Sequence, residues 1–173
     1  MDEKLVKVLP QMNGEFLYIP FVGAIIERVV GGEKQVLVQT REKKSDPKYS
    51  GSLEIPGGKF RANEDVYETL KREVKEECGL DITNISGQDK RKNYINRKDS
   101  SDIIEPFCVT QMANGPFIGI IFLCKAEGKL LSKTNETKDS QWIGYGDLKE
   151  IVDKNPERIY TAFLAPLKKY FNL

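Results

Sequence analysis

Three glutamates stand close together in the chain at a spacing that could bind a metal ion. Glu73, Glu76 and Glu77 occupy positions i, i+3 and i+4, so a helix of 3.6 residues per turn would bring their carboxylates to one side. Like charges at this spacing repel, and each contact costs roughly 0.2–0.5 kcal/mol on an exposed helix. A divalent cation would offset the repulsion, and carboxylate oxygens suit Mg²⁺ or Mn²⁺. The pattern therefore indicates a site for one of these ions.

The glutamates need a helix, and its two ends can be read from the sequence. Asp65 can cap the first backbone amides, Glu68 can reach back to it in a capping box, and Gly79 is a suitable end. Glu77 falls at the end of an apolar stripe that repeats every four residues and must pack on a core, made of Val66, Leu70, Val74 and Cys78. A carboxylate near a buried face needs a hydrogen-bond donor or a metal as its partner.

A longer pattern over residues 58–80 is far more specific than the acid cluster. Its specified positions are Gly58, Glu64, Arg72, Glu73, Val74, Glu76, Glu77, Gly79 and Leu80. The segment resembles the Nudix box, G-x5-E-x7-R-E-U-x-E-E-x-G-U with U a bulky aliphatic residue, at every specified position. A chance match in one window is on the order of one in a billion. The run KREVKEE alone would be more typical of a solvated helix face, but the complete pattern favours the Nudix interpretation.

The resemblance implies a metal-dependent enzyme in which water attacks phosphorus in a nucleoside diphosphate linked to another group. The residues that match the family's metal ligands are Gly58, through its backbone carbonyl, Glu73, Glu76 and Glu77. Glu64 and Arg72 match a supporting pair, in which the arginine orients the glutamates through charge-assisted hydrogen bonds. Mg²⁺ or Mn²⁺ is the implied cofactor.

Other residues of the site are less sharply indicated. The general base varies across the family, being a box glutamate or one from a later loop, and Glu136 stands a few residues before Trp142, where such a glutamate is often found. Residues 135–141 are equally consistent with a simple polar loop. Arg41 and Lys59 flank the site in sequence and could hold substrate phosphates, with a surface salt bridge as the alternative for each.

The box departs from the usual family pattern at Asn63, where glycine is common just before the first glutamate. Asparagine tolerates positive φ better than most residues, so we expect the turn to be preserved.

The identity of the substrate is open. The proline that the ADP-ribose group often carries about sixteen residues after the box is absent, and residues 96–98 read Asn-Arg-Lys there. We expect a nucleoside triphosphate or a nucleotide sugar as substrate. A catalytically weak domain that binds or senses a nucleotide is the alternative.

Composition limits the partners of the protein. The 173 residues include 27 Lys and Arg and 26 Asp and Glu, which gives a net charge of +1. We therefore expect a single domain over residues 1–173 with a small nucleotide as its partner, and no long nucleic acid or membrane. The oligomeric state is open, and a homodimer is one alternative.

Residue usage also limits the chemistry and the compartment. The chain has no histidine, which excludes Ser-His and Cys-His mechanisms and imidazole ligands for zinc. Its three cysteines lack metal-ligand spacing and are expected to be reduced and buried, namely Cys78, Cys108 and Cys124. The N-terminal residues have no apolar leader segment, so a cytoplasmic location is expected.

The elements around the box predict an α/β (α+β) fold, a Nudix-type α/β/α sandwich with a mixed β-sheet. Strands are expected over residues 15–19, 21–30, 34–40, 52–55, 81–86, 105–113, 117–126 and 140–143, with Pro20 breaking the first two apart. Hairpin turns are expected at residues 31–32 and 114–115. Helices follow at residues 146–152 and 156–170. The polar residues 88–102 are expected to form a long loop, either functional or simply solvated.

Overall fold

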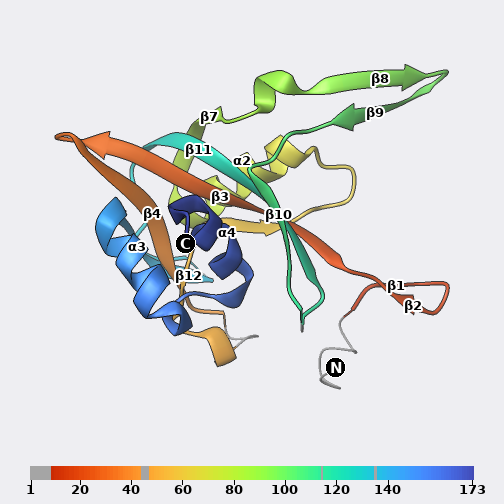
Figure 1. Cartoon of the computed structure of the whole chain (residues 1–173). Coiled ribbons are helices and arrows are strands. Elements are labelled where there is room, and N and C mark those ends of the chain that lie inside the picture. The colour runs from red at the N-terminus through yellow and green to blue at the C-terminus, as the bar shows by residue number, and fades with distance from the viewer. Residues whose placement is uncertain (1–8, 44–46, 114, 135) are drawn as a thin grey trace.

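A twisted mixed β-sheet forms the centre of the molecule, with helices on both of its faces (Figure 1). The computed structural model describes residues 9–43, 47–113, 115–134 and 136–173. The predicted α/β/α sandwich is confirmed. None of the helices in these ranges has the length and apolar character that crossing a bilayer requires.

The main sheet has the strand order β10-β11-β3-β4-β12, with β5 paired to β4, β6 to β3 and β7 to β11. Its strands are β3 (Ile19–Val30), β4 (Glu33–Arg41), β5 (Leu53–Glu54), β6 (Gly57–Lys59), β7 (Leu80–Ile85), β10 (Cys108–Gln111), β11 (Phe117–Gly128) and β12 (Thr137–Gly144). Two small hairpins stand outside it, made of β1 (Gln11–Met12) with β2 (Glu15–Phe16), and β8 (Lys92–Asn96) with β9 (Asp99–Ile103). The helices are α2 (Val66–Cys78), α3 (Tyr145–Lys154) and α4 (Thr161–Phe171).

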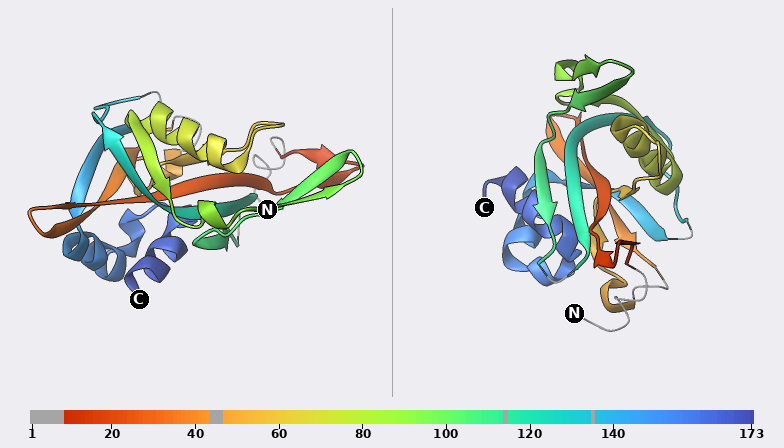
Figure 2. Two further views of the ribbon diagram at one scale, coloured as in Figure 1. Left: turned by 90° about the horizontal axis from the view of Figure 1, so that it is seen from above. Right: turned by 90° about the vertical axis from the view of Figure 1, so that its right-hand side faces the viewer.

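Both faces of the sheet are covered, which explains the continuous apolar run of its central strand. Successive residues of β3 point to opposite faces. Val22, Ala24 and Ile26 pack in the cluster that contains the buried residues of α2. Phe21 and Ile25 pack in the cluster that contains the buried residues of α3 and α4. Figure 2 shows α2 on one side of the sheet and these two helices on the other.

The apolar stripe predicted for the box helix is the surface by which α2 attaches to the sheet. Leu70, Val74 and Cys78 are buried, and Val66 is partly buried. Burying one such aliphatic side chain stabilises the fold by roughly 1.5–3 kcal/mol. Of the other cysteines predicted to be buried, Cys124 is buried, whereas Cys108 is only half-buried.

Strand β3 runs through Pro20, so the predicted break there is wrong. Ile118 of β11 lies opposite Pro20 in a parallel pairing. The carbonyl of Pro20 accepts a hydrogen bond from the N–H of Phe60 at 3.4 Å. In a strand the N–H and the carbonyl of one residue point to the same side, so the missing N–H of Pro20 would also face Phe60, which lies beyond the end of β6 at Lys59. A proline near the start of a strand, where the neighbouring strand has ended, leaves no ladder hydrogen bond unmade.

The segment predicted as a long loop, residues 88–102, folds as a 3₁₀ turn (Gln88–Lys90) followed by the β8–β9 hairpin. We call this hairpin the arm; it projects from the body of the molecule (Figure 1). All of its strand residues are exposed. Because neither face is buried, the sequence shows no apolar alternation that would identify the strands.

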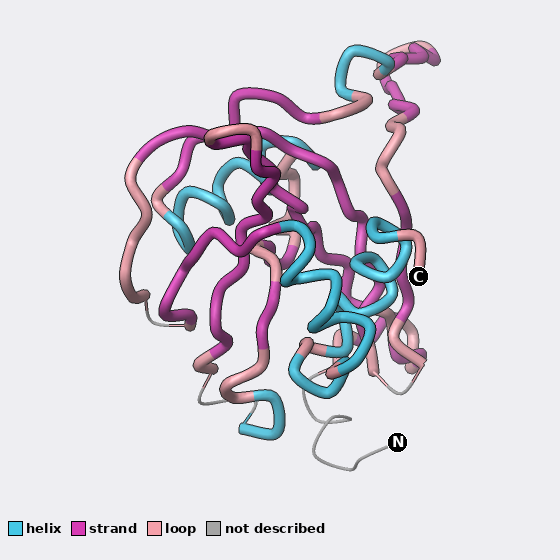
Figure 3. The backbone as a smooth tube through the Cα atoms, turned by 60° about the vertical axis from the view of Figure 1, so that its left-hand side comes forward, coloured by secondary structure: helices cyan, strands magenta, loops and turns pink. Residues whose placement is uncertain are grey.

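The C-terminal helix begins later than predicted. Pro156 opens a 3₁₀ turn (Pro156–Arg158), and α4 starts only at Thr161. Between them the N–H of Tyr160 donates to the carbonyl of Leu53 at 2.8 Å, because the chain here adds an extended segment beside β5. Figure 3 shows the two C-terminal helices close together with this short connection between them.

Candidate functional site

Helix α2 is held at both ends by the residues that the sequence indicated. The carboxylate of Asp65 accepts a hydrogen bond from the N–H of Tyr67 at 2.9 Å, and Gly79 ends the helix with φ of 77°. Asn63 adopts the positive φ expected for the preceding turn, at 64°. The predicted capping box is wrong in one respect: Glu68 accepts from Lys71 at 2.8 Å instead of reaching back to the cap.

Arg72 organises the exposed side of the acid cluster. Its Nε and Nη2 donate to the two carboxylate oxygens of Glu64 at 2.7 and 2.9 Å, a bidentate fork that lysine cannot make. Its Nη1 donates to Glu73 at 2.6 Å and to Glu76 at 3.3 Å, and Nη2 also reaches the carbonyl of Lys59 at 3.3 Å. The hydrogen bonds from Arg72 lower the pKa of Glu64 to about 2. One guanidinium thus fixes three carboxylates.

Glu77 lies on the buried side of the same helix, with only 6% of its surface exposed. Its Oε2 accepts two hydrogen bonds, from Nε2 of Gln39 at 2.7 Å and from the N–H of Gly57 at 3.0 Å. Burial, followed by the nearby negative charge of Glu54, raises the pKa of Glu77 to about 8. The charged form of this carboxylate is therefore destabilised, and a nearby cation would stabilise it.

Glu54 and Arg41 form a buried ion pair in the neighbouring strands. Nη1 of Arg41 lies 3.0 Å from Oε2 of Glu54, and the guanidinium of Arg41 also stacks on the ring of Tyr160, with 4.2 Å from Cζ to the centroid. Burial raises the pKa of Glu54, although the charge of Arg41 opposes the shift. Arg41, which we predicted to hold substrate phosphates, is thus placed against a carboxylate of the site.

Two glycines allow the backbone of β6 to approach the carboxylates closely. A Cβ atom added to Gly58 would lie 2.2 Å from the carboxyl carbon of Glu73, and one added to Gly57 would lie 2.1 Å from the carbonyl oxygen of Val22. Neither position can accept a side chain without displacing what surrounds it. The backbone of Gly58 and the carboxylate of Glu73 therefore lie in contact.

Two predicted residues lie at the rim. Lys59 is exposed and follows Gly58 directly. Glu136 is exposed and forms an ion pair with Lys43, and its carbonyl accepts from the N–H of Glu42 at 2.8 Å. The structure therefore places Glu136 at the end of β4, outside the hydrogen-bond network of the box.

Sequence reasoning missed Gln39 and Glu54. Gln39 directly follows the apolar residues 36–38 of β4, Glu54 lies between Leu53 and Ile55, and both are fully or almost fully buried. A buried polar side chain in an apolar strand needs a partner, and this signal could have drawn attention to them before the fold was known.

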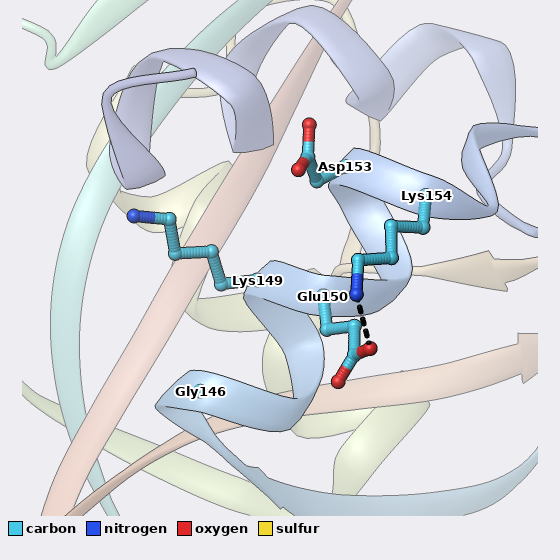
Figure 4. Close-up of a pocket in the computed structure, with 5 residues that line it drawn as sticks. All are labelled: Gly146, Lys149, Glu150, Asp153 and Lys154. Carbon is cyan, nitrogen blue, oxygen red and sulfur yellow. Dashed lines mark hydrogen bonds and ion pairs between the residues drawn. The ribbon is translucent and has the colours of Figure 1, made fainter.

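A shallow hollow on the surface of α3 is a different feature. It is lined by residues of that single helix, Gly146, Lys149, Glu150, Asp153 and Lys154 (Figure 4). Lys154 and Glu150 pair with each other at 2.8 Å. Because α3 covers the face of the sheet opposite α2, this hollow includes none of the box carboxylates.

The residues at α2 suit a divalent cation in chemical type. Hydrogen bonds from the described residues fall on Oε1 of Glu73 and on Oε2 of Glu77, which leaves the second oxygen of each carboxylate open. Such hard oxygen donors are those that Mg²⁺ and Mn²⁺ prefer. Within the described ranges no three acidic, histidine or cysteine side chains already form a ligand group. Binding of an ion would therefore require the carboxylates that hydrogen-bond to Arg72 to move toward a common point.

Comparison with known protein families agrees with this geometry. The model of the NUDIX domain family matches residues 20–163. The chain belongs to the Nudix family. Nudix hydrolases cleave phosphoanhydride bonds in nucleotide-linked compounds, bind small nucleotide substrates and generally use divalent metal ions. The protein is accordingly a pyrophosphohydrolase of the Nudix class.

Solved Nudix structures share the fold at low sequence identity. A NUDIX hydrolase from Nitrosomonas europaea is 19% identical, with a TM-score of 0.63, over 91% of this chain and 72% of that one. A MutT NUDIX hydrolase from Burkholderia pseudomallei is 18% identical, with a TM-score of 0.55, over 87% and 95%. The NUDIX domain of Shewanella oneidensis NrtR, complexed with ADP ribose, is 14% identical, with a TM-score of 0.58, over 99% and 98%. The comparison with curated proteins gave no match.

Proposed function

We propose that this Nudix domain hydrolyses a small nucleotide, either a nucleoside triphosphate or a nucleotide sugar, with Mg²⁺ or Mn²⁺ as its cofactor. The observation that carries the proposal is the buried Glu77 carboxylate, whose partners among the described residues are the neutral donors of Gln39 and Gly57. A buried carboxylate with a raised pKa is stabilised in its charged form by a cation. The complete Nudix box supplies the further ligands for that cation.

Each residue of the box has a role in the proposed reaction. Glu73, Glu76 and Glu77, with the carbonyl of Gly58, would hold the ion. A bound divalent ion neutralises charge on the diphosphate and activates water. Arg72 keeps the first two carboxylates in place through its hydrogen bonds at 2.6 and 3.3 Å. Arg72 is itself fixed by its fork to Glu64, so these carboxylates are held near one another before the ion and the substrate bind.

The general base and the phosphate contacts are proposed with alternatives. The base is one of the box glutamates or Glu136, whose carboxylate pairs with Lys43. Lys59 is exposed beside Gly58 and suits a substrate phosphate. Arg41 forms an ion pair with Glu54. Its guanidinium would have to break this ion pair in order to contact a substrate phosphate.

The substrate class follows from the family and from the fold. A small nucleotide is favoured because Nudix domains bind such compounds, and the NrtR domain with the same fold was solved with ADP ribose. This chain lacks the proline that the ADP-ribose group often carries. A nucleoside triphosphate or another nucleotide sugar therefore fits better.

A turnover assay tests the proposal. Release of phosphate, pyrophosphate or nucleoside monophosphate would be measured over a nucleotide panel with Mg²⁺ or Mn²⁺, for wild type and Glu77→Gln. We expect turnover of at least one member and a loss on the order of 10²–10³-fold in Glu77→Gln, the size seen when a transition-state stabilising group is removed.

Glu68→Gln is the matched control, because Glu68 lies on the exposed side of the same helix and pairs only with Lys71 among the described residues. It should keep wild-type turnover. If no member of a broad panel is hydrolysed while one is bound, the domain binds nucleotides without turning them over and the proposal fails.

A further inference from the structure

Gln39 is a buried amide at the centre of the sheet and does not belong to the Nudix box. None of its surface is exposed, and its neighbours on β4, Val36, Leu37 and Val38, are buried apolar residues. An amide buried without hydrogen bonds destabilises the fold. The side chain therefore needs partners on every side, and the structure supplies them.

All partners of the Gln39 side chain belong to the site or lie next to it. Its Nε2 donates to Oε2 of Glu77 at 2.7 Å, and its Oε1 accepts from the thiol of Cys78 at 3.1 Å. The same side chain hydrogen-bonds Glu54. One neutral amide thus links the two buried carboxylates, which repel each other and share Lys43 as a nearby positive charge.

The two carboxylates and the thiol of Cys78 agree on which way the amide points. An amide can be turned by 180°, but a carboxylate only accepts hydrogen bonds and a thiol is the donor here. In the reversed orientation the Gln39 oxygen would face the Glu77 carboxylate and its NH₂ group would face the S–H. Only the observed orientation satisfies both contacts.

We infer that Gln39 is a positioning residue, which holds Oε2 of Glu77 so that Oε1 is presented to the metal ion, and that Cys78 fixes Gln39 in the orientation this requires. The inference rests on the proposed metal-dependent function. Gln39 touches neither substrate nor ion in this role. It acts through Glu77, together with the N–H of Gly57, which donates to the same oxygen at 3.0 Å.

The test is binding of Mn²⁺ alone, measured by calorimetry and by electron paramagnetic resonance, together with the melting temperature of each variant. Gln39→Met keeps the volume and removes both the donor and the acceptor. We expect its Mn²⁺ affinity to fall about 10–100-fold, as for loss of a residue that orients a ligand. The melting temperature should change little, because an apolar side chain suits the buried strand. Gln35→Met, on the same strand outside the site, is the matched control and should bind Mn²⁺ as wild type does.

The cysteine gives a second, independent readout. Cys78→Ser keeps a hydrogen-bond donor and should retain Mn²⁺ affinity close to that of wild type. Cys78→Ala removes the donor to Oε1 of Gln39, holds the amide less firmly, and should weaken Mn²⁺ binding. A purely structural role would not separate these two variants in metal affinity at similar melting temperatures.

The outcomes separate this inference from the proposed function. If wild type binds no Mn²⁺, the proposed function itself fails. If wild type binds Mn²⁺ and a folded Gln39→Met binds it equally well, only the positioning role is overturned. Should Gln39→Met not fold, equal affinities of Cys78→Ser and Cys78→Ala would overturn it.

Discussion

At the scale of single residues, the site is divided between an exposed and a buried set of carboxylates on one helix. Arg72 neutralises Glu64, Glu73 and Glu76 from the solvent side. Glu77 receives hydrogen bonds from the neutral groups of Gln39 and Gly57. Desolvation destabilises a charge by more than hydrogen bonds from neutral groups stabilise it. The charged form of the buried Glu77 is therefore more strongly destabilised than that of the other carboxylates. This destabilisation appears as its raised pKa.

The raised pKa of Glu77 predicts how the stability of the metal-free protein depends on pH. The pKa is about 8 in the folded protein and 4.5 in its ordinary state. Between these values the folded protein holds a proton that the unfolded chain has released, so the free energy of unfolding falls as pH rises. We expect a loss of a few kcal/mol from pH 5 to 8, measured by urea unfolding with a chelator present.

Glu77→Gln should remove most of this dependence, because its side chain is neutral at every pH. Glu68→Gln should keep the dependence of wild type. An equally steep fall in Glu77→Gln would show that another group is responsible, of which the buried Glu54 is the first to examine.

At the scale of elements, α2 packs on the sheet through its apolar stripe. The hydroxyl of Tyr67 is a polar group buried at this contact. Tyr67 is 1% exposed, and its ring packs on Phe122 with 5.5 Å between centroids. Arg91 lies over the other part of the ring, with 5.6 Å from its Cζ to the centroid. The hydroxyl of Tyr67 has no hydrogen-bond partner among the described residues. The ring therefore stabilises the attachment of α2, while the hydroxyl weakens it.

Tyr67→Phe should stabilise the protein. Removing a buried hydroxyl without a partner recovers its desolvation penalty, about 1–3 kcal/mol, which corresponds to roughly 2–4 °C in melting temperature per kcal/mol for a chain of this length. Differential scanning calorimetry would measure the change. Tyr94→Phe, at the exposed arm, is the control and should leave the melting temperature unchanged. A lower melting temperature in Tyr67→Phe would mean that the hydroxyl is hydrogen-bonded to ordered water.

At the scale of the whole molecule, the arm stands apart from the doubly covered sheet. Its base is tied to the body by ion pairs, Arg91 to Asp65 at 2.7 Å and Lys90 to Glu105 at 3.1 Å. Its two strands pair only with each other and bury none of their residues. A two-stranded hairpin without packing is marginally stable in water. Stability is therefore unevenly distributed over the molecule.

Hydrogen exchange should reveal this distribution. Amides of β8 and β9 should exchange close to the rate of an unprotected chain, whereas those of β3 and β11 should exchange only through global unfolding. Mass spectrometry of peptides covering residues 92–103 and 117–128 would compare them directly. Strong protection of the arm would contradict its isolation, and a dependence of that protection on protein concentration would point to contact with a second copy.

The local features of the site could be predicted because they depend on one helix. The period of an α-helix alone places Glu73, Glu76 and Glu77 together, and Asp65 and Gly79 mark the ends of that helix. What failed were features without a local signal, namely the arm, whose strands bury neither face, and Pro20, whose missing N–H falls beyond the neighbouring strand.

The sequence by itself determined the family, the box helix and the carboxylates that it carries, since Glu73, Glu76 and Glu77 lie within about two turns of one helix. The tertiary structure alone decided what surrounds Glu77. Gln39 lies 38 positions away from it in the chain and Gly57 lies 20 away, and they meet because β4 and β6 join the sheet beside α2. The direction of Arg41 toward Glu54 was settled in the same way. Such contacts depend on strand pairing across the fold, which no local period encodes.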